Sequence, residues 1–187
     1  MKITGGRAGG IPIDVLKGNR TRPTTDRIRE SVFGGLQGRL EDAVVLDLFA
    51  GSGAMGLEAA SRGASKVDFV EKHNGTAKNI ERNVSKLPRA GVESKMKVHC
   101  TDSYRYLKSG AVNGIDLIFV DPPYVHFEAN GAYNDLLSAV DRSGALAKQG
   151  LLVIESSSRL TFPEHPAWTC IKQKNYGAST VSYWQAV

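Results

Sequence analysis

The stretch LDLFAGSGAMG, residues 46–56, decides the fold predicted from this sequence. Two valines precede it, so an apolar, β-prone run leads directly into a loop rich in glycine. Gly51, Gly53 and Gly56 have the spacing G-x-G-x-x-G, in which glycines allow a tight turn and a close approach of a ligand to the backbone. The spacing alone is a weak signal, but a buried strand followed by such a loop indicates an α/β fold.

Strand-like and helix-like patterns alternate outward from this loop along most of the chain. Short apolar runs predict strands at 44–49, 66–70, 96–100, 115–120 and 151–154, and periodic apolar positions predict helices at 57–62, 76–87, 104–107 and 136–146. Near the end, residues 168–175 and 180–185 flank Gly177 and predict an antiparallel hairpin. This order indicates an α/β, Rossmann-like fold, with a mostly parallel seven-stranded sheet that ends in the hairpin and carries helices on both faces.

Length and composition fit one folded domain without a membrane segment. The 187 residues are 41% hydrophobic and 23% charged, an ordinary balance for a globular protein. No apolar run could span a bilayer, and the first residues, MKITGGRAGG, lack the apolar region of a signal peptide. Cys100 and Cys170 do not have the spacing of metal ligands, so we expect a cytoplasmic protein with reduced thiols and no metal.

The net charge of +5 is concentrated near the start of the chain. Residues 1–39 hold eight lysines and arginines against three acidic residues, whereas residues 40–187 hold sixteen of each sign. An arginine-rich segment of this kind favours contact with phosphate groups, although a solvated basic face without a ligand would have the same composition. The chain is therefore expected to divide into a basic N-terminal extension with the first helix, 1–39, and a main domain, 40–187.

Three acidic residues stand at successive strand ends. Asp47 lies in the first strand, Glu71 ends the second, and Asp102 follows the third. Because parallel strands present their carboxyl ends at one edge of the sheet, the three side chains are expected to face one crevice. Glu71 can accept hydrogen bonds from ribose hydroxyls and Asp102 from an adenine amino group, while Asp47 would repel a pyrophosphate and attract a cationic amino acid. The set favours a nucleoside ligand over a nicotinamide dinucleotide, although each residue alone is more often a cap or turn residue.

A second motif, GIDLIFVDPPYVHF at 114–127, ends the fourth strand with Asp121, Pro122, Pro123 and Tyr124. Prolines cannot continue a central strand, and the fourth strand should lie beside the first, so this motif is expected beside the glycine loop. Asp121 and the Pro122 carbonyl can accept the two N–H bonds of an exocyclic amine, and Tyr124 can stack on an extruded base. The motif predicts group transfer to a nucleobase amine, whereas a plain Asp-Pro-Pro turn would explain the prolines alone.

The glycine loop and the Asp-Pro-Pro-Tyr motif together resemble class I methyltransferases that use S-adenosyl-L-methionine and modify amino groups. Through TRPTTDRIRESVFGGL at 21–36, the early ITGGRAGG and the closing Tyr-Gly hairpin, the chain is similar to the RsmD family along nearly its whole length. The resemblance implies methyl transfer to the exocyclic N2 of one guanine of 16S ribosomal RNA, guanine 966 in the usual numbering. For a small basic enzyme of this kind we expect a monomer, and we expect its 16S ribosomal RNA substrate within a partly assembled 30S subunit.

The motifs and the resemblance together assign three kinds of site residue. The catalytic residues are Asp121, Pro122, Pro123 and Tyr124. The cofactor-binding residues are Thr25, Asp47, Phe49, Ala50, Gly51, Ser52, Gly53, Glu71, Asp102 and Ser103. The substrate-binding residues are Arg7, Arg22, Thr24 and Arg27.

The segment 21–36 also predicts a helix on physical grounds. Thr25 or Asp26 can cap its start, and every third or fourth residue after them is apolar. This stripe leaves Arg27 and Arg29 outside it, where they would be solvated or free to contact a ligand.

Two other functions remain open from the sequence. The first is methylation of adenine N6 in DNA, because an Asp-Pro-Pro-Tyr motif suits exocyclic amines of either base. A chain this short has no added domain for recognising a DNA target, which argues against it. The second is a nucleic-acid-binding domain that keeps the fold but has no catalytic activity.

Overall fold

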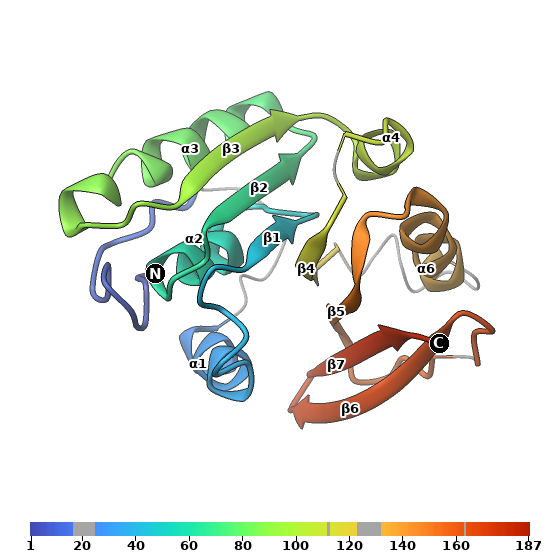
Figure 1. Ribbon diagram of the computed structural model, residues 1–187. Coiled ribbons are helices and arrows are strands. Elements are labelled where there is room, and N and C mark those ends of the chain that lie inside the picture. Colours follow the sequence, from blue (N-terminus) through green and yellow to red (C-terminus); the bar gives the residue numbers. More distant parts are fainter. Residues whose placement is uncertain (17–24, 112, 123–131, 163) are drawn as a thin grey trace.

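The computed structural model describes residues 1–16, 25–111, 113–122, 132–162 and 164–187. Four of the predicted site residues lie outside these ranges, namely Arg22, Thr24, Pro123 and Tyr124. Figure 1 shows a twisted sheet with helices on both of its faces. The prediction of an α/β, Rossmann-like fold is therefore confirmed.

The sheet of the described residues has seven strands in the order β3-β2-β1-β4-β5-β7-β6. The parallel strands β1 to β5 span Val44–Asp47, Lys66–Glu71, Lys95–Cys100, Ile115–Val120 and Leu146–Ser157. The hairpin of β6 (Trp168–Tyr176) and β7 (Ser179–Ala186) completes the sheet, with β7 antiparallel to β5. Strand order reverses between β1 and β4, and such a reversal opens a ligand crevice at the carboxyl ends of these two strands.

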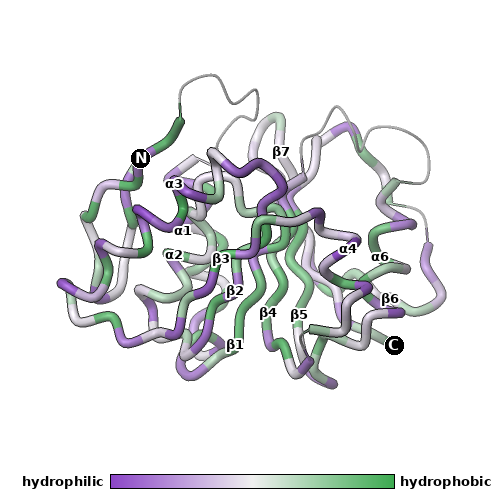
Figure 2. Tube along the Cα trace, turned by 90° about the horizontal axis from the view of Figure 1, so that it is seen from above, coloured by the Kyte–Doolittle hydropathy of each residue, from purple (hydrophilic) through white to green (hydrophobic). Residues whose placement is uncertain are grey.

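Two layers of helices cover the sheet (Figure 1). The helices α1 (Asp26–Gly35), α2 (Ala54–Ser61) and α3 (Asn74–Val84) pack on one face, and α4 (Ser103–Lys108) and α6 (Ala132–Ser143) pack on the other. A single 3₁₀ turn, Pro88–Ala90, follows α3. Figure 2 shows the apolar central strands running between these layers, as expected for a parallel sheet that is buried on both faces. None of the described helices is long and apolar enough to cross a membrane.

Each predicted strand overlaps an observed strand, but the strand predicted at 151–154 is much shorter than β5, and the helix predicted at 136–146 begins and ends later than α6. Gly144 has a φ of +61°, a left-handed conformation that is typical of the position just after a helix, and α6 ends at Ser143. Leu146 then pairs with Ile115 and begins β5. The apolar residues 145 and 146 continued the helical period, which is why the pattern placed them in the wrong element.

The first residues of the chain pack into the same core as the main domain. Lys2 and Pro12 form an antiparallel bridge, so the segment folds back on itself. Ile3, Ala8 and Ile13 are buried in the core cluster on the side of α1, α2 and α3. The N-terminal segment therefore adds apolar surface to one helical layer.

The prediction that Arg29 lies outside the apolar stripe of α1 is wrong, whereas Arg27 is exposed as predicted. The side chains of Arg29 and Glu58 are both 0% exposed, and Arg29 Nε lies 3.4 Å from Glu58 Oε2. Arg29 also donates a hydrogen bond to the Lys2 carbonyl, and Glu58 Oε2 accepts one from the Thr4 N–H at 2.7 Å. The N-terminal segment covers this side of α1, and an arginine buried in this way needs an acidic partner.

Candidate functional site

The carboxyl end of β1 carries a buried acidic side chain. Asp47 is 3% exposed, and its Oδ2 accepts a hydrogen bond of 3.0 Å from the Gly56 N–H at the start of α2. Burial raises the pKa of Asp47 to about 7, and the nearby Glu71 carboxylate adds to this rise while the Gly56 bond opposes it. A cationic group bound beside Asp47 would favour its ionised form, so the site is suited to an ammonium group.

The glycine loop after β1 has a conformation that only glycine adopts easily. Gly51 and Gly53 have φ values of +52° and +81°, and the Gly53 N–H donates to the Ala50 carbonyl at 2.6 Å. A Cβ atom on Gly56 would lie 2.3 Å from Phe69 Cε1, so Gly56 is needed where α2 packs on β2. The first two glycines therefore form the turn, and the third allows the helix to approach the sheet, as the spacing predicts.

Glu71, at the end of β2, connects its strand to this loop. Its Oε2 accepts from the Gly51 N–H at 3.1 Å, and its Oε1 accepts from the His73 N–H at 2.8 Å. A carboxylate has about four acceptor positions, so these two bonds leave capacity for the hydroxyl groups of a ribose. The residue is half-buried, which keeps the carboxylate accessible at the rim of the crevice.

Asp102 and Ser103 connect the end of β3 to α4. Asp102 caps the helix, because its Oδ1 accepts from the Tyr104 and Arg105 N–H groups at 3.0 and 3.1 Å. Its side chain is exposed, and the cap uses only one of its two oxygens. Ser103 is buried and donates to the Leu48 carbonyl at 2.6 Å, which ties α4 to the residue that follows β1. Both positions therefore lie at the edge where Asp47 ends its strand.

The second motif starts beside the glycine loop, as predicted. Asp47 is opposite Phe119 in the pairing of β1 with β4, and the Leu48 N–H donates to the Phe119 carbonyl at 3.0 Å. Asp121 follows two residues later and is half-buried, while Pro122 is buried. The structure therefore brings the start of the Asp-Pro-Pro-Tyr motif to the same edge as the three strand-end carboxylates.

The remaining cofactor positions line or support this loop. Phe49 and Ser52 are half-buried and Ala50 is buried. The Ala50 N–H donates to the Val70 carbonyl at 3.0 Å, so the pairing of β1 with β2 continues into the loop. The start of the loop thus follows directly from the sheet.

The described site residues of the N-terminal region, which are the predicted cofactor residue Thr25 and the predicted substrate residues Arg7 and Arg27, lie in two different places. Thr25 caps α1 by accepting from the Ile28 N–H at 3.3 Å, and Arg27 lies in the first turn of the helix. Arg7 is instead bound to the segments that precede β2 and β3, since its backbone N–H donates to the Ser61 carbonyl at the end of α2 and its Nη1 donates to the Gly91 carbonyl at 3.2 Å. The structure therefore does not bring Arg7 close to Asp47 or Asp121.

One buried residue close to the loop was not among the predicted site residues. Asn83, near the end of α3, donates from Nδ2 to the Ser52 carbonyl at 3.2 Å. Its spacing of four residues from Asn79 places both amides on one helical face, which is a signal that sequence reasoning could have used.

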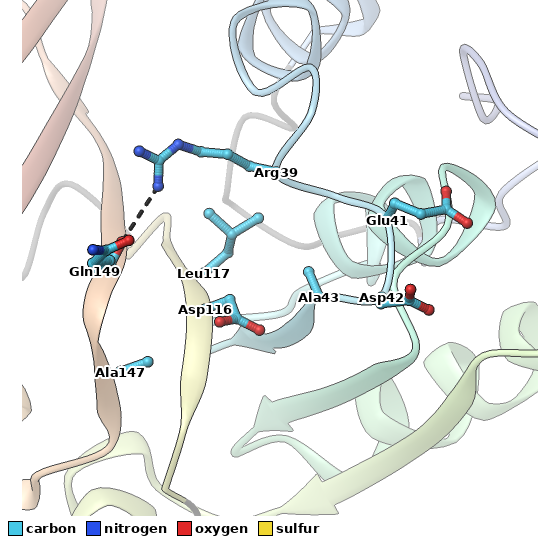
Figure 3. Close-up of a pocket in the computed structure, with 8 residues that line it drawn as sticks. All are labelled: Arg39, Glu41, Asp42, Ala43, Asp116, Leu117, Ala147 and Gln149. Atoms are coloured by element: carbon cyan, nitrogen blue, oxygen red, sulfur yellow. Dashed lines mark hydrogen bonds between the residues drawn. The ribbon is translucent and has the colours of Figure 1, made fainter.

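A separate cavity of about 260 Å³ opens at the amino-terminal ends of the strands (Figure 3). It is lined by Arg39, Glu41, Asp42, Ala43, Asp116, Leu117, Ala147 and Gln149. None of the predicted site residues lines it, and its charges are of both signs. Among the residues that the structure describes, no group of three or more histidine, cysteine, aspartate or glutamate side chains could hold a metal ion.

Comparisons with known proteins agree with this arrangement. The family model described as "Conserved hypothetical protein 95" matches residues 1–185. The chain is 33% identical over 179 residues to "Ribosomal RNA small subunit methyltransferase D" of Escherichia coli, covering 95% of this chain and 85% of the relative. The structure of the "Putative methyltransferase yhhF" from Escherichia coli has a TM-score of 0.82 and 32% identity, covering 100% of this chain and 97% of that one.

A more distant structure shares the fold alone. It is "A putative sam-dependent methyltransferase from Streptococcus mutans", with a TM-score of 0.63 and 16% identity, and the match covers 86% of this chain and 48% of that one. The methyltransferase fold is therefore common to relatives and to distant structures alike.

Proposed function

We propose that this protein methylates one guanine of 16S ribosomal RNA. The chain belongs to the family described as Conserved hypothetical protein 95, which is the RsmD family of ribosomal RNA methyltransferases. The proposed acceptor is the exocyclic N2 of guanine 966, and the proposed donor is S-adenosyl-L-methionine. The observation that carries this proposal is that Asp47, Glu71, Asp102 and Asp121 meet at one edge of the sheet beside the glycine loop.

The residues at this edge fit the proposed donor. Glu71 and Asp102 offer carboxylate oxygens to ribose hydroxyls and to the adenine amino group. Asp47, buried and with a raised pKa, suits the ammonium group of the methionine part, whose charge would hold the carboxyl in its ionised form. The donor supplies an electrophilic methyl group on a sulfonium.

Asp121 and Pro122 act on the acceptor amine in this proposal. The N2 lone pair of guanine is conjugated with the ring, which makes the nitrogen a poor nucleophile. Hydrogen bonds from its two N–H groups to the Asp121 carboxylate and the Pro122 carbonyl would hold the nitrogen in position with its lone pair directed at the methyl group. The amine loses one proton after substitution, and Asp121 or solvent accepts it.

The remaining predicted residues bind the RNA in this proposal. Tyr124, outside the described residues, stacks on the extruded base, and Pro123 fixes the backbone so that the Pro122 carbonyl stays directed at the amine. Arg22, Thr24 and Arg27 contact the nucleotides around it, and Arg7 reaches the RNA at a distance from the reacting base. The basic region 1–39 would serve as the RNA-contacting extension of the catalytic domain, 40–187. A monomer acting in the cytoplasm on a partly assembled 30S particle completes the proposal.

Mass spectrometric mapping of 16S ribosomal RNA tests the acceptor. Ribosomes from cells with and without this protein are compared, and we expect N2-methylguanosine to disappear at position 966 alone. Loss of a different modification, or of none, would contradict the proposed base and position.

Methyl-transfer assays with the purified protein test the substrate class. Deproteinised 16S RNA, partly assembled small subunits and duplex DNA are offered in parallel with labelled donor. We expect RNA-containing substrates to be methylated and Asp121→Ala to abolish most of this activity, while DNA remains unmodified. Activity on DNA alone would favour adenine N6 methylation, and unchanged activity of Asp121→Ala would remove the catalytic role of that residue.

A further inference from the structure

Helix α3 presents two buried amide side chains toward the N-terminal segment and the glycine loop. Asn79 and Asn83 are four residues apart, so they lie on one face of the helix. They are 3% and 1% exposed, although both are polar. Amides buried this deeply need hydrogen-bond partners, because an unpaired buried amide is destabilising.

Asn83 uses every hydrogen-bonding position of its amide. Its Oδ1 accepts from the Asp14 N–H at 2.9 Å and from Lys86 Nζ at 3.0 Å. Its Nδ2 donates to the Asp14 carbonyl at 3.0 Å and to the Ser52 carbonyl at 3.2 Å. The side chain thus pairs with the backbone of Asp14 in both directions and uses its remaining N–H for the glycine loop.

Among the described residues, Asn79 bonds to the backbone of Asp14 and makes no bond to the glycine loop. Its Nδ2 donates to the Asp14 carbonyl at 2.7 Å and so shares one acceptor with Asn83. Both amides therefore anchor the N-terminal segment, but Asn83 also reaches Ser52. Substitution of Asn79 therefore affects only the anchoring of the N-terminal segment, whereas substitution of Asn83 also affects the support of the glycine loop.

The hydrogen bond to the Ser52 carbonyl restrains the glycine loop between its first two glycines. Ser52 lies between Gly51 and Gly53, the two glycines in the left-handed region, so the loop backbone has more accessible conformations than other residues would allow. Glu71 holds one side of the loop through the Gly51 N–H, and Asn83 holds the other side through Ser52. Restricting a binding loop to one conformation before the ligand arrives increases affinity.

We propose that Asn83 is a positioning residue that holds the glycine loop in its cofactor-binding conformation and fixes it relative to Asp14. Asp14 lies three residues before residue 17, where the basic stretch that contains Arg22 and Thr24 begins. One amide thereby connects the backbone of the cofactor loop to the segment that leads into the RNA-contacting residues. The proposal rests on the proposed function only for the identity of the cofactor.

Calorimetric titration with S-adenosylmethionine, without RNA, tests the role of Asn83. Asn83→Ala should weaken binding about fivefold, which corresponds to the net contribution of one hydrogen bond. Asn79→Ala is the matched control: it removes an anchor of Asp14 but leaves the bond to Ser52, so its dissociation constant should stay within about twofold of the wild-type value. Melting temperatures of both variants show how much stability each has lost.

A near-isosteric variant carries the test if Asn83→Ala does not fold. Asn83→Asp keeps the size of the side chain and the acceptor for the Asp14 N–H, but it has no N–H to donate to Ser52. We expect it to weaken cofactor binding at least as much as the alanine variant would, because a carboxylate oxygen would face the Ser52 carbonyl, while the Lys86 ammonium group at 3.0 Å offsets part of the added charge.

The proposal is overturned if the variants of Asn79 and Asn83 weaken cofactor binding equally, or if the Asn83 variants bind as tightly as the wild type. Steady-state kinetics give a second criterion: a positioning role should raise the KM for the cofactor more than it lowers kcat. Failure of the proposed RNA target is distinguishable, because it would leave these RNA-free titrations unchanged.

Discussion

Asp47 is buried at the carboxyl end of β1, and burial changes the ionisation of its carboxyl group. Its pKa rises from an ordinary value of 3.8 to about 7 because the carboxyl is buried, and Glu71 adds to the effect. Between these two values the folded protein keeps a proton that the unfolded chain has lost. The contribution of Asp47 to folding stability is therefore largest below pH 4 and decreases as the pH rises to about 7.

We predict that Asp47→Asn is stabilised relative to the wild type more at pH 8 than at pH 5, because asparagine cannot ionise. Urea unfolding of both proteins at the two pH values measures this difference. Cofactor binding should respond in the opposite direction: wild-type affinity should fall as the pH drops below about 7, and Asp47→Asn should bind weakly at every pH. Equal stability differences at both pH values would contradict the raised pKa.

A substitution at Gly56 tests how closely α2 packs on β2. A Cβ atom there would lie 2.3 Å from Phe69 Cε1 and 2.9 Å from Val67 Cγ1. We predict that Gly56→Ala destabilises the protein by about 1–3 kcal/mol through overpacking, as measured by chemical denaturation. Gly34→Ala is the matched control, since nothing lies within 4 Å of its added Cβ in helix α1, and it should stabilise the protein by roughly 0.5–1 kcal/mol.

At the scale of secondary-structure elements, local patterns predicted the strands well and the limits of the helices less well. Strands β1 and β4 are compact, mostly apolar runs, and the hairpin is marked by Gly177. The end of α6 depends on Gly144, whose left-handed conformation outweighed two apolar residues that continued the period. Helix periodicity alone does not contain this information.

Packing between elements buries Arg29, although the pattern within its own helix predicts that it is exposed. On an isolated α1 its position lies beside the apolar stripe and would be solvated. In the protein, the N-terminal segment and Glu58 of α2 enclose it. The partners come from positions 27 and 29 residues away, so the pattern within the helix could not predict them.

We predict that Glu58→Gln strongly destabilises the junction of α1, α2 and the N-terminal segment. The substitution removes the buried partner of Arg29 and leaves only the half-exposed Asp26, so the loss should approach the roughly 3–5 kcal/mol typical of a broken buried ion pair. Asp26→Asn is the control, because Asp26 is a 44% exposed partner of Arg29 and its loss should cost less than about 1 kcal/mol. Urea unfolding measures both, and similar effects of the two substitutions would argue against the importance of burial.

At the scale of the whole molecule, the candidate site was more predictable than the path of the N-terminal segment. Asp47, Glu71 and Asp102 were expected at one edge because parallel strands end there, and the structure places them so. The positions of Arg7 and Asp14 depend on contacts with Ser61 and Asn83, residues far away in the chain. No local periodicity encodes such contacts, since they arise only when the core assembles.

The N-terminal segment and the main domain should therefore unfold together. Ile3, Ala8 and Ile13, together with Phe33 and Leu36 of the α1 region, are buried in one cluster with the sheet residues of the main domain. We predict that a fragment of residues 40–187 lacks a cooperative thermal transition, because deletion exposes this apolar face to water. Calorimetry of the full chain should show a single transition, and Arg7→Ala, which changes an exposed side chain, should preserve it. A fragment that melts cooperatively near the temperature of the full chain would show that the extension is a separate unit.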